Sequence, residues 1–168
     1  MASDTQIIAE EGKQDLFIIR EFDAPREMVF KAFSDPEILV QFFAPFDCTM
    51  EFNHHDYRTG GSYNWCHKNN EGKTVCTFYG VIHELTAPER MIQTSEFMDL
   101  PERGGVILEI IQFENLPDGK TRVSIHEICP SLAIRDAIVS SGMEKGLTDI
   151  FIKLDKLLIA LPGNILKK

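Results

Sequence analysis

The sequence lacks the features that define several large classes of protein. It has no apolar run close to the roughly 18 residues that a membrane-spanning helix needs, so we expect no membrane insertion. Its first residues, MASDTQIIAEEGKQD, contain no basic stretch followed by an apolar one, which argues against a signal peptide. Lys and Arg number 17 against 26 Asp and Glu and form no basic stripe, so we expect no nucleic-acid partner.

Motifs for several common chemistries are also missing. There is no GxSxG motif and no P-loop, and no helical pattern follows the glycines of GGVILE, which is therefore not a dinucleotide fingerprint. The four cysteines include no CxxC pair, and we expect reduced thiols in a cytoplasmic protein. Neither Cys76 nor Cys129 has basic neighbours that would favour a thiolate. We therefore expect no cofactor and no thiol catalysis.

The segment HHD at residues 54–56 is the place where a metal site has to be considered. Adjacent histidines on a strand point to opposite faces of a sheet, so His54 and His55 cannot easily bind one ion. We therefore expect no metal.

Short β-rich segments alternate with turn signals between residues 47 and 128. Six candidate strands, the first being CTMEFNHHDYR and the last TRVSIHEI, are separated by breakers such as TGG, NNEG and LPDG. Another candidate strand, DLFIIREF, occupies residues 15–22. Loops this short predict an antiparallel meander.

Helical patterns flank these strands. DAPREMVFKAF predicts a short helix with Pro25 in its first turn, and the next helical turn is capped either by Ser34 with Glu37 or by Asp35. SLAIRDAIVSSG predicts a further short helix. The last helix is the longest, and Phe151 widens its apolar stripe, which consists of Met143, Leu147, Ile150, Leu154, Leu157 and Leu161.

Together these elements predict an α+β fold. We expect a curved antiparallel sheet of six to seven strands that closes on the long C-terminal helix, with two short helices after the first strand. A single domain should span residues 13–162, after a flexible segment at residues 1–12 and before a tail at residues 163–168.

FSDPEILVQFFAP, residues 33–45, places Phe42 and Phe43 side by side after a very short helix. Ile38 and Leu39 lie one turn earlier, so two i, i+4 apolar pairs result. Two explanations are open: the segment is a wedge packed into a core, or it lines an apolar cavity.

The hairpin around LPDG is expected to bring two glutamates opposite each other. If Glu114 faces Arg122 across the hairpin, then Ile111 faces Ile125 and Glu109 faces Glu127 on the opposite, apolar face. Two carboxylates on a buried rung would raise at least one pKa, as in an acid/base pair, a cation site or a polar anchor for a ligand. Alternatively, the rung lies at the open end of the sheet and water solvates both groups.

Alternation in SYNWCHK puts Tyr63, Trp65 and His67 on one face. These three side chains suit either the wall of a ligand pocket or an ordinary core. A contact of His67 with Glu109 or Glu127 would strengthen an acid/base mechanism.

Gly146 lies beside the apolar stripe of the last helix, next to Met143. Glycine there costs about 1 kcal/mol relative to alanine in helix propensity. Either the helix backbone packs closely on the sheet at this point, or the glycine leaves room for a ligand.

Five segments match a known family in order: REFDAPREMVFKAFSDPEIL (20–39), DYRTGGSYNW (56–65), YGVIHELTAPERM (79–91), FENLPDGKTRVSIHE (113–127) and SGMEKGLTDIFIKLDKLL (141–158). On these residues the chain resembles the activator of heat-shock-protein-90 ATPase homologue family, within the START-like or SRPBCC superfamily. The resemblance implies the helix-grip fold, with a cavity for an apolar ligand between the long helix and the sheet. The family usually has tryptophan at Phe42 or Phe43 and again near Leu147, so the resemblance also implies an atypical cavity here.

Three functions are open. In the first, the chain binds a small hydrophobic or aromatic molecule, of the lipid or polyketide kind, in a cavity of roughly 300 Å³ or more. In the second, it is a cyclase- or hydrolase-like enzyme that uses Glu109, Glu127 or His67 in that cavity. In the third, which rests on the resemblance alone, it contacts a heat-shock-protein-90 chaperone as a co-chaperone-like stimulator of its ATPase. A homodimer is also left open. We favour ligand binding, through Phe42, Phe43, Tyr63, Trp65, His67, Phe78, Ile111, Met143, Gly146, Leu147 and Ile150.

Overall fold

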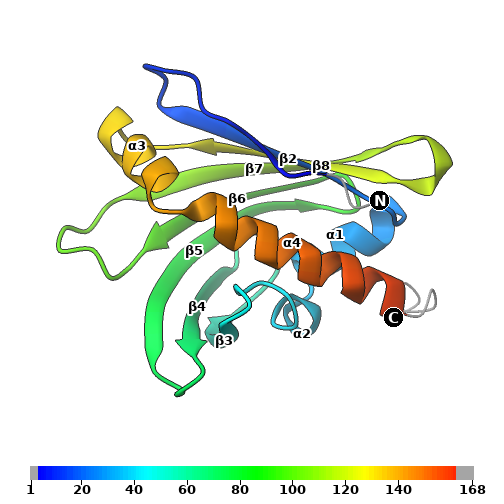
Figure 1. The fold of residues 1–168 in the computed structure, drawn as a ribbon, viewed down its shortest axis with the longest axis horizontal. Helices are drawn as coiled ribbons and strands as arrows, with labels where there is room; N and C mark the ends of the chain where they lie inside the picture. Colours follow the sequence, from blue (N-terminus) through cyan, green and yellow to red (C-terminus); the bar gives the residue numbers. More distant parts are fainter. Residues whose placement is uncertain (1–3, 162–168) are drawn as a thin grey trace.

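The computed structural model describes residues 4–161, and its main feature is a curved antiparallel sheet (Figure 1). The sheet has eight strands in the order β1-β2-β8-β7-β6-β5-β4-β3. The strands are β1 (Gln6–Ile8), β2 (Asp15–Phe22), β3 (Cys48–His55), β4 (Ser62–Asn69), β5 (Thr74–Thr86), β6 (Arg90–Phe97), β7 (Val106–Asn115) and β8 (Thr121–Ile128). The α-helices are α1 (Arg26–Ser34), α2 (Pro36–Leu39), α3 (Leu132–Ser140) and α4 (Met143–Ala160), and a 3₁₀ turn, η1 (Pro117–Gly119), lies between β7 and β8.

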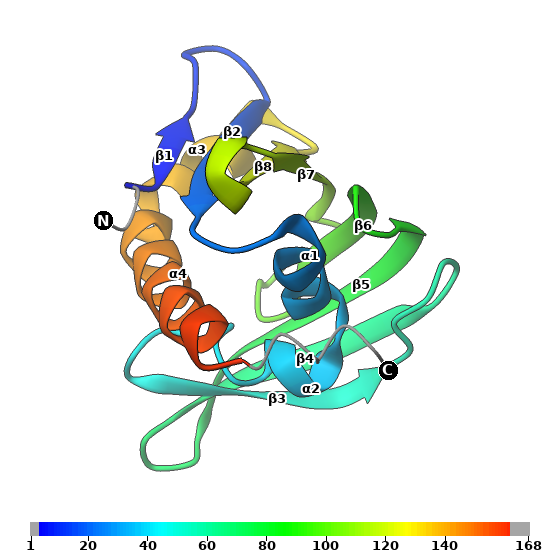
Figure 2. The same ribbon diagram turned by 90° about the vertical axis from the view of Figure 1, so that its right-hand side faces the viewer.

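The long helix α4 and the short helices α1 and α2 lie inside the curve of the sheet (Figure 2). The sheet stays open, with β1 and β3 as its two edges. Phe30 of α1 packs on Phe113 of β7, with the ring centroids 5.1 Å apart. This arrangement is the helix-grip fold, and the predicted α+β class is confirmed.

All the strands predicted between residues 15 and 128 are present, but the sheet has one strand more than the six to seven expected. The additional strand is β1, in which Ile7 pairs with Ile18 of β2. It lies within residues 1–12, which we expected to be flexible. Three residues are too few for a period-two pattern to be recognised. The expected tail at residues 163–168 lies outside the described residues.

The helix α4 presents a slightly different face to the core than its sequence pattern predicts. Ile150, Leu154 and Leu158 are buried at a spacing of four residues. Leu157 and Leu161, which belonged to the predicted stripe, are only partly buried. Met143 and Leu147, at the other end of the predicted stripe, are also only partly buried, so the most buried row of the helix is Ile150, Leu154 and Leu158.

A buried ion pair joins α4 to β2. Arg20 is 3% exposed, and its Nη2 donates a hydrogen bond to Asp155 Oδ2 at 2.5 Å. The Arg20 guanidinium also lies over the rings of Phe22 and Phe151. A cation in the apolar interior is thus compensated both by a carboxylate and by aromatic faces.

The start of α2 is capped by Asp35. Its Oδ1 accepts a hydrogen bond from the Glu37 N–H at 3.0 Å, and Pro36 occupies the first helical position. Ser34, the other candidate cap, instead donates its hydroxyl to the Phe30 carbonyl. Of the two predicted caps, the structure contains the Asp35 cap.

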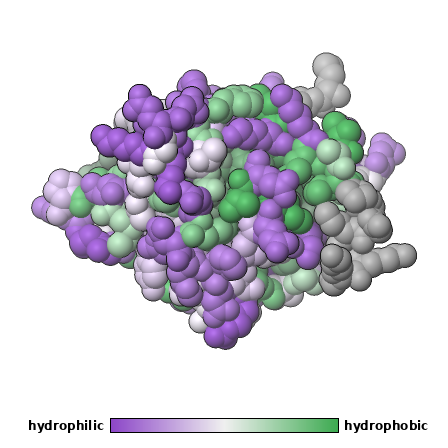
Figure 3. All heavy atoms as spheres, turned by 90° about the horizontal axis from the view of Figure 1, so that it is seen from below, coloured by the Kyte–Doolittle hydropathy of each residue, from purple (hydrophilic) through white to green (hydrophobic). Residues whose placement is uncertain are grey.

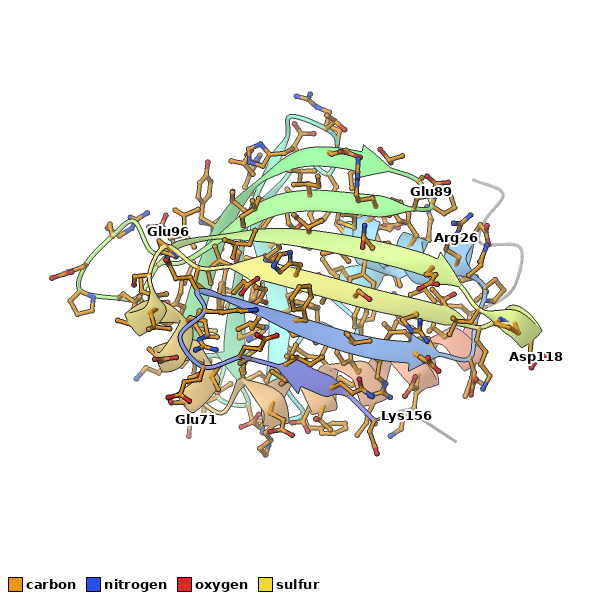
Figure 4. All side chains as sticks on the ribbon, turned by 90° about the horizontal axis from the view of Figure 1, so that it is seen from above. Arg26, Glu71, Glu89, Glu96, Asp118 and Lys156 are labelled. Atoms are coloured by element: carbon orange, nitrogen blue, oxygen red, sulfur yellow. The ribbon has the colours of Figure 1, made fainter. Side chains whose placement is uncertain are left out.

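Charged side chains lie at both ends of the sheet (Figure 4). Arg26 and Glu89 lie at one end of the strands, and Glu96 lies at the other. Glu96 is 8% exposed and accepts hydrogen bonds from the Arg103 side chain and the Gly104 N–H, which anchors the β6–β7 loop.

The outer surface is mainly hydrophilic on the face seen from below, where hydrophobic side chains show between charged and polar ones (Figure 3). Within residues 4–161, no helix is both long and apolar enough to cross a membrane.

Candidate functional site

A small cavity lies between the sheet and α4. Its volume is about 80 Å³, well below the expected 300 Å³ or more. Most of its wall is aliphatic or aromatic, and the lining residues are Ile18, Phe33, Leu39, Phe43, Tyr57, Tyr63, Trp65, Met91, Gln93, Ser95, Glu109, Ile111, Ile125, Glu127, Leu147 and Phe151. The polar groups come from β4, β6, β7 and β8 and from the segment between β3 and β4. The α4 side contributes only Leu147 and Phe151.

The two glutamates face each other as the hairpin pattern predicts. In the β7–β8 pair, Glu109 is the partner of Glu127, and Glu114 is the partner of Arg122. Both Glu109 and Glu127 are partly buried, and both line the cavity. The rung is therefore part of the interior wall and is not a fully solvated end of the sheet.

The carboxyl groups of this rung are difficult to ionise. Burial raises the pKa of Glu109, an effect opposed by the Gln93 Nε2, which donates a hydrogen bond to Glu109 Oε2 at 2.6 Å. Burial and the neighbouring Glu109 charge together raise the pKa of Glu127 to about 8. At neutral pH the two carboxyls therefore retain at least one proton between them.

The two carboxyls differ in their hydrogen bonding. Glu109 is held by Gln93, its cross-strand neighbour on β6. Glu127 has no hydrogen-bond partner among the described residues of the chain. Its carboxyl group therefore offers free acceptor positions to the cavity.

Tyr63 reaches across β5 to bond with β6. Its hydroxyl donates a hydrogen bond to the Thr94 carbonyl at 2.6 Å, and burial raises its pKa well above the ordinary value. This path requires Gly80, because a Cβ at that position would overlap the Tyr63 ring and the Thr94 carbonyl. The absence of a side chain at Gly80 thus allows the Tyr63 ring to pass over β5.

The adjacent phenylalanines do different things. Phe42 is 1% exposed and packs edge-on against Phe33, with the ring centroids 5.9 Å apart. Phe43 is partly buried, lines the cavity and meets Trp65 edge-on at 5.7 Å. Phe42 is therefore packed into the core, and Phe43 lines the cavity.

His67 lies away from the carboxyl pair. Its Nε2 is 2.8 Å from the Phe43 carbonyl oxygen, and since a carbonyl only accepts, this nitrogen carries the hydrogen. Burial lowers the pKa of His67, so the imidazole is neutral at pH 7. No described contact joins His67 to Glu109 or Glu127, and the side chain is not on the cavity wall.

The residues proposed for ligand binding divide into two groups. Those that line the cavity are Phe43, Tyr63, Trp65, Ile111 and Leu147. The others lie in the surrounding core or nearby and do not line it: Phe42, His67, Phe78, Met143, Gly146 and Ile150. Phe78, for example, stacks on Trp65 with ring centroids 4.4 Å apart.

Gly146 is not required for close packing. A Cβ there would meet its nearest neighbour, Pro45 Cγ, at 3.9 Å, which is an ordinary contact. The close approach of the helix backbone to the sheet, one of the two explanations for this glycine, therefore does not occur.

Several wall residues were missed by the sequence analysis, Gln93 and Tyr57 among them. Gln93 follows the period-two pattern of β6 and shares its inward face with Met91, which is 1% exposed. A polar residue on such a face could have been recognised as a ligand-facing group. Tyr57 lies after the end of β3, where no periodicity applies.

No cluster of at least three His, Cys, Asp or Glu side chains within residues 4–161 could hold a metal ion. The four cysteines are free, and burial together with the nearby Glu127 charge raises the pKa of Cys129 to about 11.

Solved structures from several organisms share this fold. One from Rhodobacter sphaeroides is 22% identical and has a TM-score of 0.82, covering 94% of this chain and 100% of its own. One from Chromobacterium violaceum is 27% identical, with a TM-score of 0.75 and coverage of 86% and 96%. The AHSA1 protein from Silicibacter pomeroyi is 25% identical, with a TM-score of 0.69 and coverage of 87% and 98%.

Among curated proteins there is no match to this chain. The family model described as Activator of Hsp90 ATPase homolog 1-like protein matches residues 23–159. Its START-like fold is one that commonly binds ligands. The chain therefore belongs to the family of Activator of Hsp90 ATPase homolog 1-like proteins.

Proposed function

We propose that the protein binds a small ligand with an apolar or aromatic body in the cavity between the sheet and α4. The observation that carries this proposal is the wall itself, which is aliphatic and aromatic apart from a few polar groups around Glu109. Such a combination is typical of ligand pockets, in which a few polar groups orient an otherwise apolar molecule.

The size of the cavity limits how the ligand is held. A volume of about 80 Å³ exceeds the roughly 15 Å³ that one water molecule needs, but it is smaller than the roughly 150 Å³ of an engineered cavity that binds benzene. A ligand with an aromatic ring therefore requires side chains of the wall to move. Phe43 and Leu147 are suited to this, because both are only partly buried.

Trp65 provides a direct test, since it is the only tryptophan and lines the cavity. Benzyl alcohol, a neutral probe, should change its fluorescence in a saturable manner. Leu147→Phe should fill part of the cavity and weaken this binding, whereas Ile159→Phe should not, because Ile159 is 86% exposed on the same helix.

Native mass spectrometry of freshly purified protein complements the titration by detecting a co-purified small molecule. A saturable Trp65 response that Leu147→Phe alone weakens supports the proposal. The absence of both a saturable response and a co-purified molecule would overturn it, as would equal binding by the two phenylalanine variants.

A second candidate is a cyclase- or hydrolase-like enzyme, favoured by the pKa of Glu127, which at about 8 lies near the range useful for proton transfer. In this case Glu109→Gln and Glu127→Gln should each abolish hydrolysis of a simple ester such as phenyl acetate while preserving the fold. Unchanged hydrolysis in both variants would exclude the carboxyls as catalytic groups for that reaction.

A third candidate, contact with an Hsp90-type chaperone, is favoured by the family to which the chain belongs. The test is a pull-down at low salt with purified chaperone, followed by an ATPase measurement. Failure to recover the chaperone would count against this role.

A further inference from the structure

The carboxyl rung of the cavity wall has acceptor positions that no group of the described chain occupies. The carboxyls of Glu109 and Glu127 supply four oxygen atoms, of which Gln93 occupies one. The Tyr63 hydroxyl uses its hydrogen on the Thr94 carbonyl and so presents only lone pairs to other groups. The remaining oxygens of the rung can therefore accept hydrogen bonds from donors that a ligand brings.

The wall also lacks a positive charge. None of its lining residues is Lys, Arg or His. The two arginines that are buried in the described residues, Arg20 and Arg135, pair with Asp155 and Asp136. The carboxyl rung is consequently left without a counter-charge from the described residues of the chain.

We propose that Glu109 and Glu127 together bind the ammonium group of a small apolar amine, which donates its N–H groups to the free oxygens of the rung. The inference rests on the proposed function, since it names the chemical class of the ligand for the same cavity. An ammonium group has three donors and no acceptor, which matches the unoccupied oxygens of the rung.

The aromatic residues of the wall favour the same class of ligand. Phe43, Tyr57, Tyr63 and Trp65 all line the cavity. Aromatic faces attract organic cations, most strongly where water is excluded. A metal ion is a poorer match, because Mg²⁺ and Ca²⁺ require about six or more oxygen ligands and the wall is mostly apolar.

The titratable groups around the rung predict how the binding of an amine depends on pH. Tyr57, Tyr63 and Cys129 have pKa values raised by burial, Cys129 to about 11, and α4 contributes only apolar side chains to the wall. The group that titrates around the cavity between pH 6 and about 8 is therefore Glu127, which faces Glu109, whose pKa burial also raises. Amine affinity should rise with pH toward 8, because the amine requires an ionised carboxylate.

The experiment compares benzylamine with benzyl alcohol, which has the same ring but no positive charge. Both are titrated against wild type, Glu127→Gln, Glu109→Gln and Glu114→Gln, with Trp65 fluorescence and ring chemical shifts as readouts. Glu114 is a matched control because it lies on the same strand as Glu109 but is exposed on the outer face. Thermal unfolding verifies that each variant folds.

Benzylamine should bind wild type at least about tenfold more tightly than Glu127→Gln, which corresponds to one charge-assisted hydrogen bond. Glu109→Gln should show a similar loss, and Glu114→Gln none. Benzyl alcohol should bind all four proteins within about twofold, since a neutral hydroxyl gains little from the charge.

The two proposals fail in different ways. If benzyl alcohol binds, but benzylamine binds equally to wild type and Glu127→Gln, the amine inference is wrong and the proposed function stands. If neither probe binds wild type, the amine inference is wrong, and the proposed function is overturned as well if no small molecule co-purifies. If the benzylamine affinity does not change between pH 6 and 8, the carboxyls do not bind the amine.

Discussion

The two faces of the β7–β8 hairpin carry charge in opposite ways. On the outer face Glu114 and Arg122 are cross-strand partners, and Arg122 also pairs with Glu21 at 2.9 Å. On the inner face, five residues along the same strand, Glu109 faces Glu127 with no cation on the cavity wall. One strand pair thus combines a compensated, solvated cluster with two facing carboxyls that no cation compensates and that retain at least one proton at neutral pH.

This difference fits the proposed function, in which the inner face binds the ligand and the outer face contributes to stability. Opposite charges across strands contribute modestly to the stability of a sheet, whereas like charges on a buried rung oppose folding. In the protein without a ligand, the carboxyls of Glu109 and Glu127 therefore lack a neighbouring cation. The inner rung is therefore the more informative feature for function.

The largest effect is expected where an inner charge is deprived of its partner. Asp155→Ala leaves Arg20, which is 3% exposed, without its carboxylate. We expect the free energy of unfolding to fall by about 3 kcal/mol, because an unpaired buried cation is costly. Equilibrium denaturation with urea measures this loss, and Lys156→Ala on the exposed side of α4 serves as control.

A loss below about 1 kcal/mol in Asp155→Ala would contradict the view that inner charges depend on their partners. In that case the faces of Phe22 and Phe151 would suffice to stabilise the guanidinium.

The next effect is a pH dependence that arises from the inner rung. The folded-state pKa of Glu127, about 8, lies above the ordinary 4.5, so the unfolded chain loses this proton first as the pH rises. The free energy of unfolding should therefore fall between pH 4.5 and about 8, by up to about 1.4 kcal/mol per pH unit. Glu127→Gln should flatten this slope.

The measurement is a series of urea denaturations across that pH range. Glu114→Gln should keep the wild-type slope, because its exposed carboxyl lies on the compensated face. Parallel slopes for wild type and Glu127→Gln would show that the rung is solvated in the folded protein.

A smaller effect is expected from Gln93→Met, which removes the hydrogen bond to Glu109 at nearly constant side-chain volume. Because this hydrogen bond lowers the pKa of Glu109, its loss should raise that pKa further. We expect a loss of about 1 kcal/mol at pH 8, where the carboxyl is more often ionised, and less at pH 5. An equal loss at both pH values would indicate a packing effect.

The smallest effect is expected on the outer face. Glu114 is 62% exposed and Arg122 39% exposed, so Glu114→Ala should change the free energy of unfolding by less than about 1 kcal/mol. Adding salt should reduce even this difference. A salt-independent loss of several kcal/mol would mean that the two faces are less different than their geometry indicates.

Much of this geometry could be predicted from sequence because it depends on local periodicity. Alternation along two strands joined by a short turn determines which residues face each other, and so Glu109 and Glu127 could be paired correctly. In α4 the predicted stripe is right for Ile150, Phe151 and Leu154, whereas its remaining members are only partly buried and Leu158, which it left out, is buried.

Features that depend on distant contacts could not be predicted. The orientation of His67 follows from a carbonyl at Phe43, which only the fold brings close. The cavity volume depends on how many side chains from separate elements meet, and no local pattern contains that information. The three-residue strand β1 is recognisable only through its pairing with β2.

The passage of Tyr63 over Gly80 has a mechanical consequence. Its hydroxyl ties β4 to β6, two strands that are separated by β5 in the sheet order. The hydrogen bond of this one phenol therefore holds β4, β5 and β6 together behind the cavity and opposes their separation. The sheet side of the cavity is thereby stiffened. Enlargement of the cavity for the proposed ligand therefore requires movement of α4 and of the segment that carries Phe43.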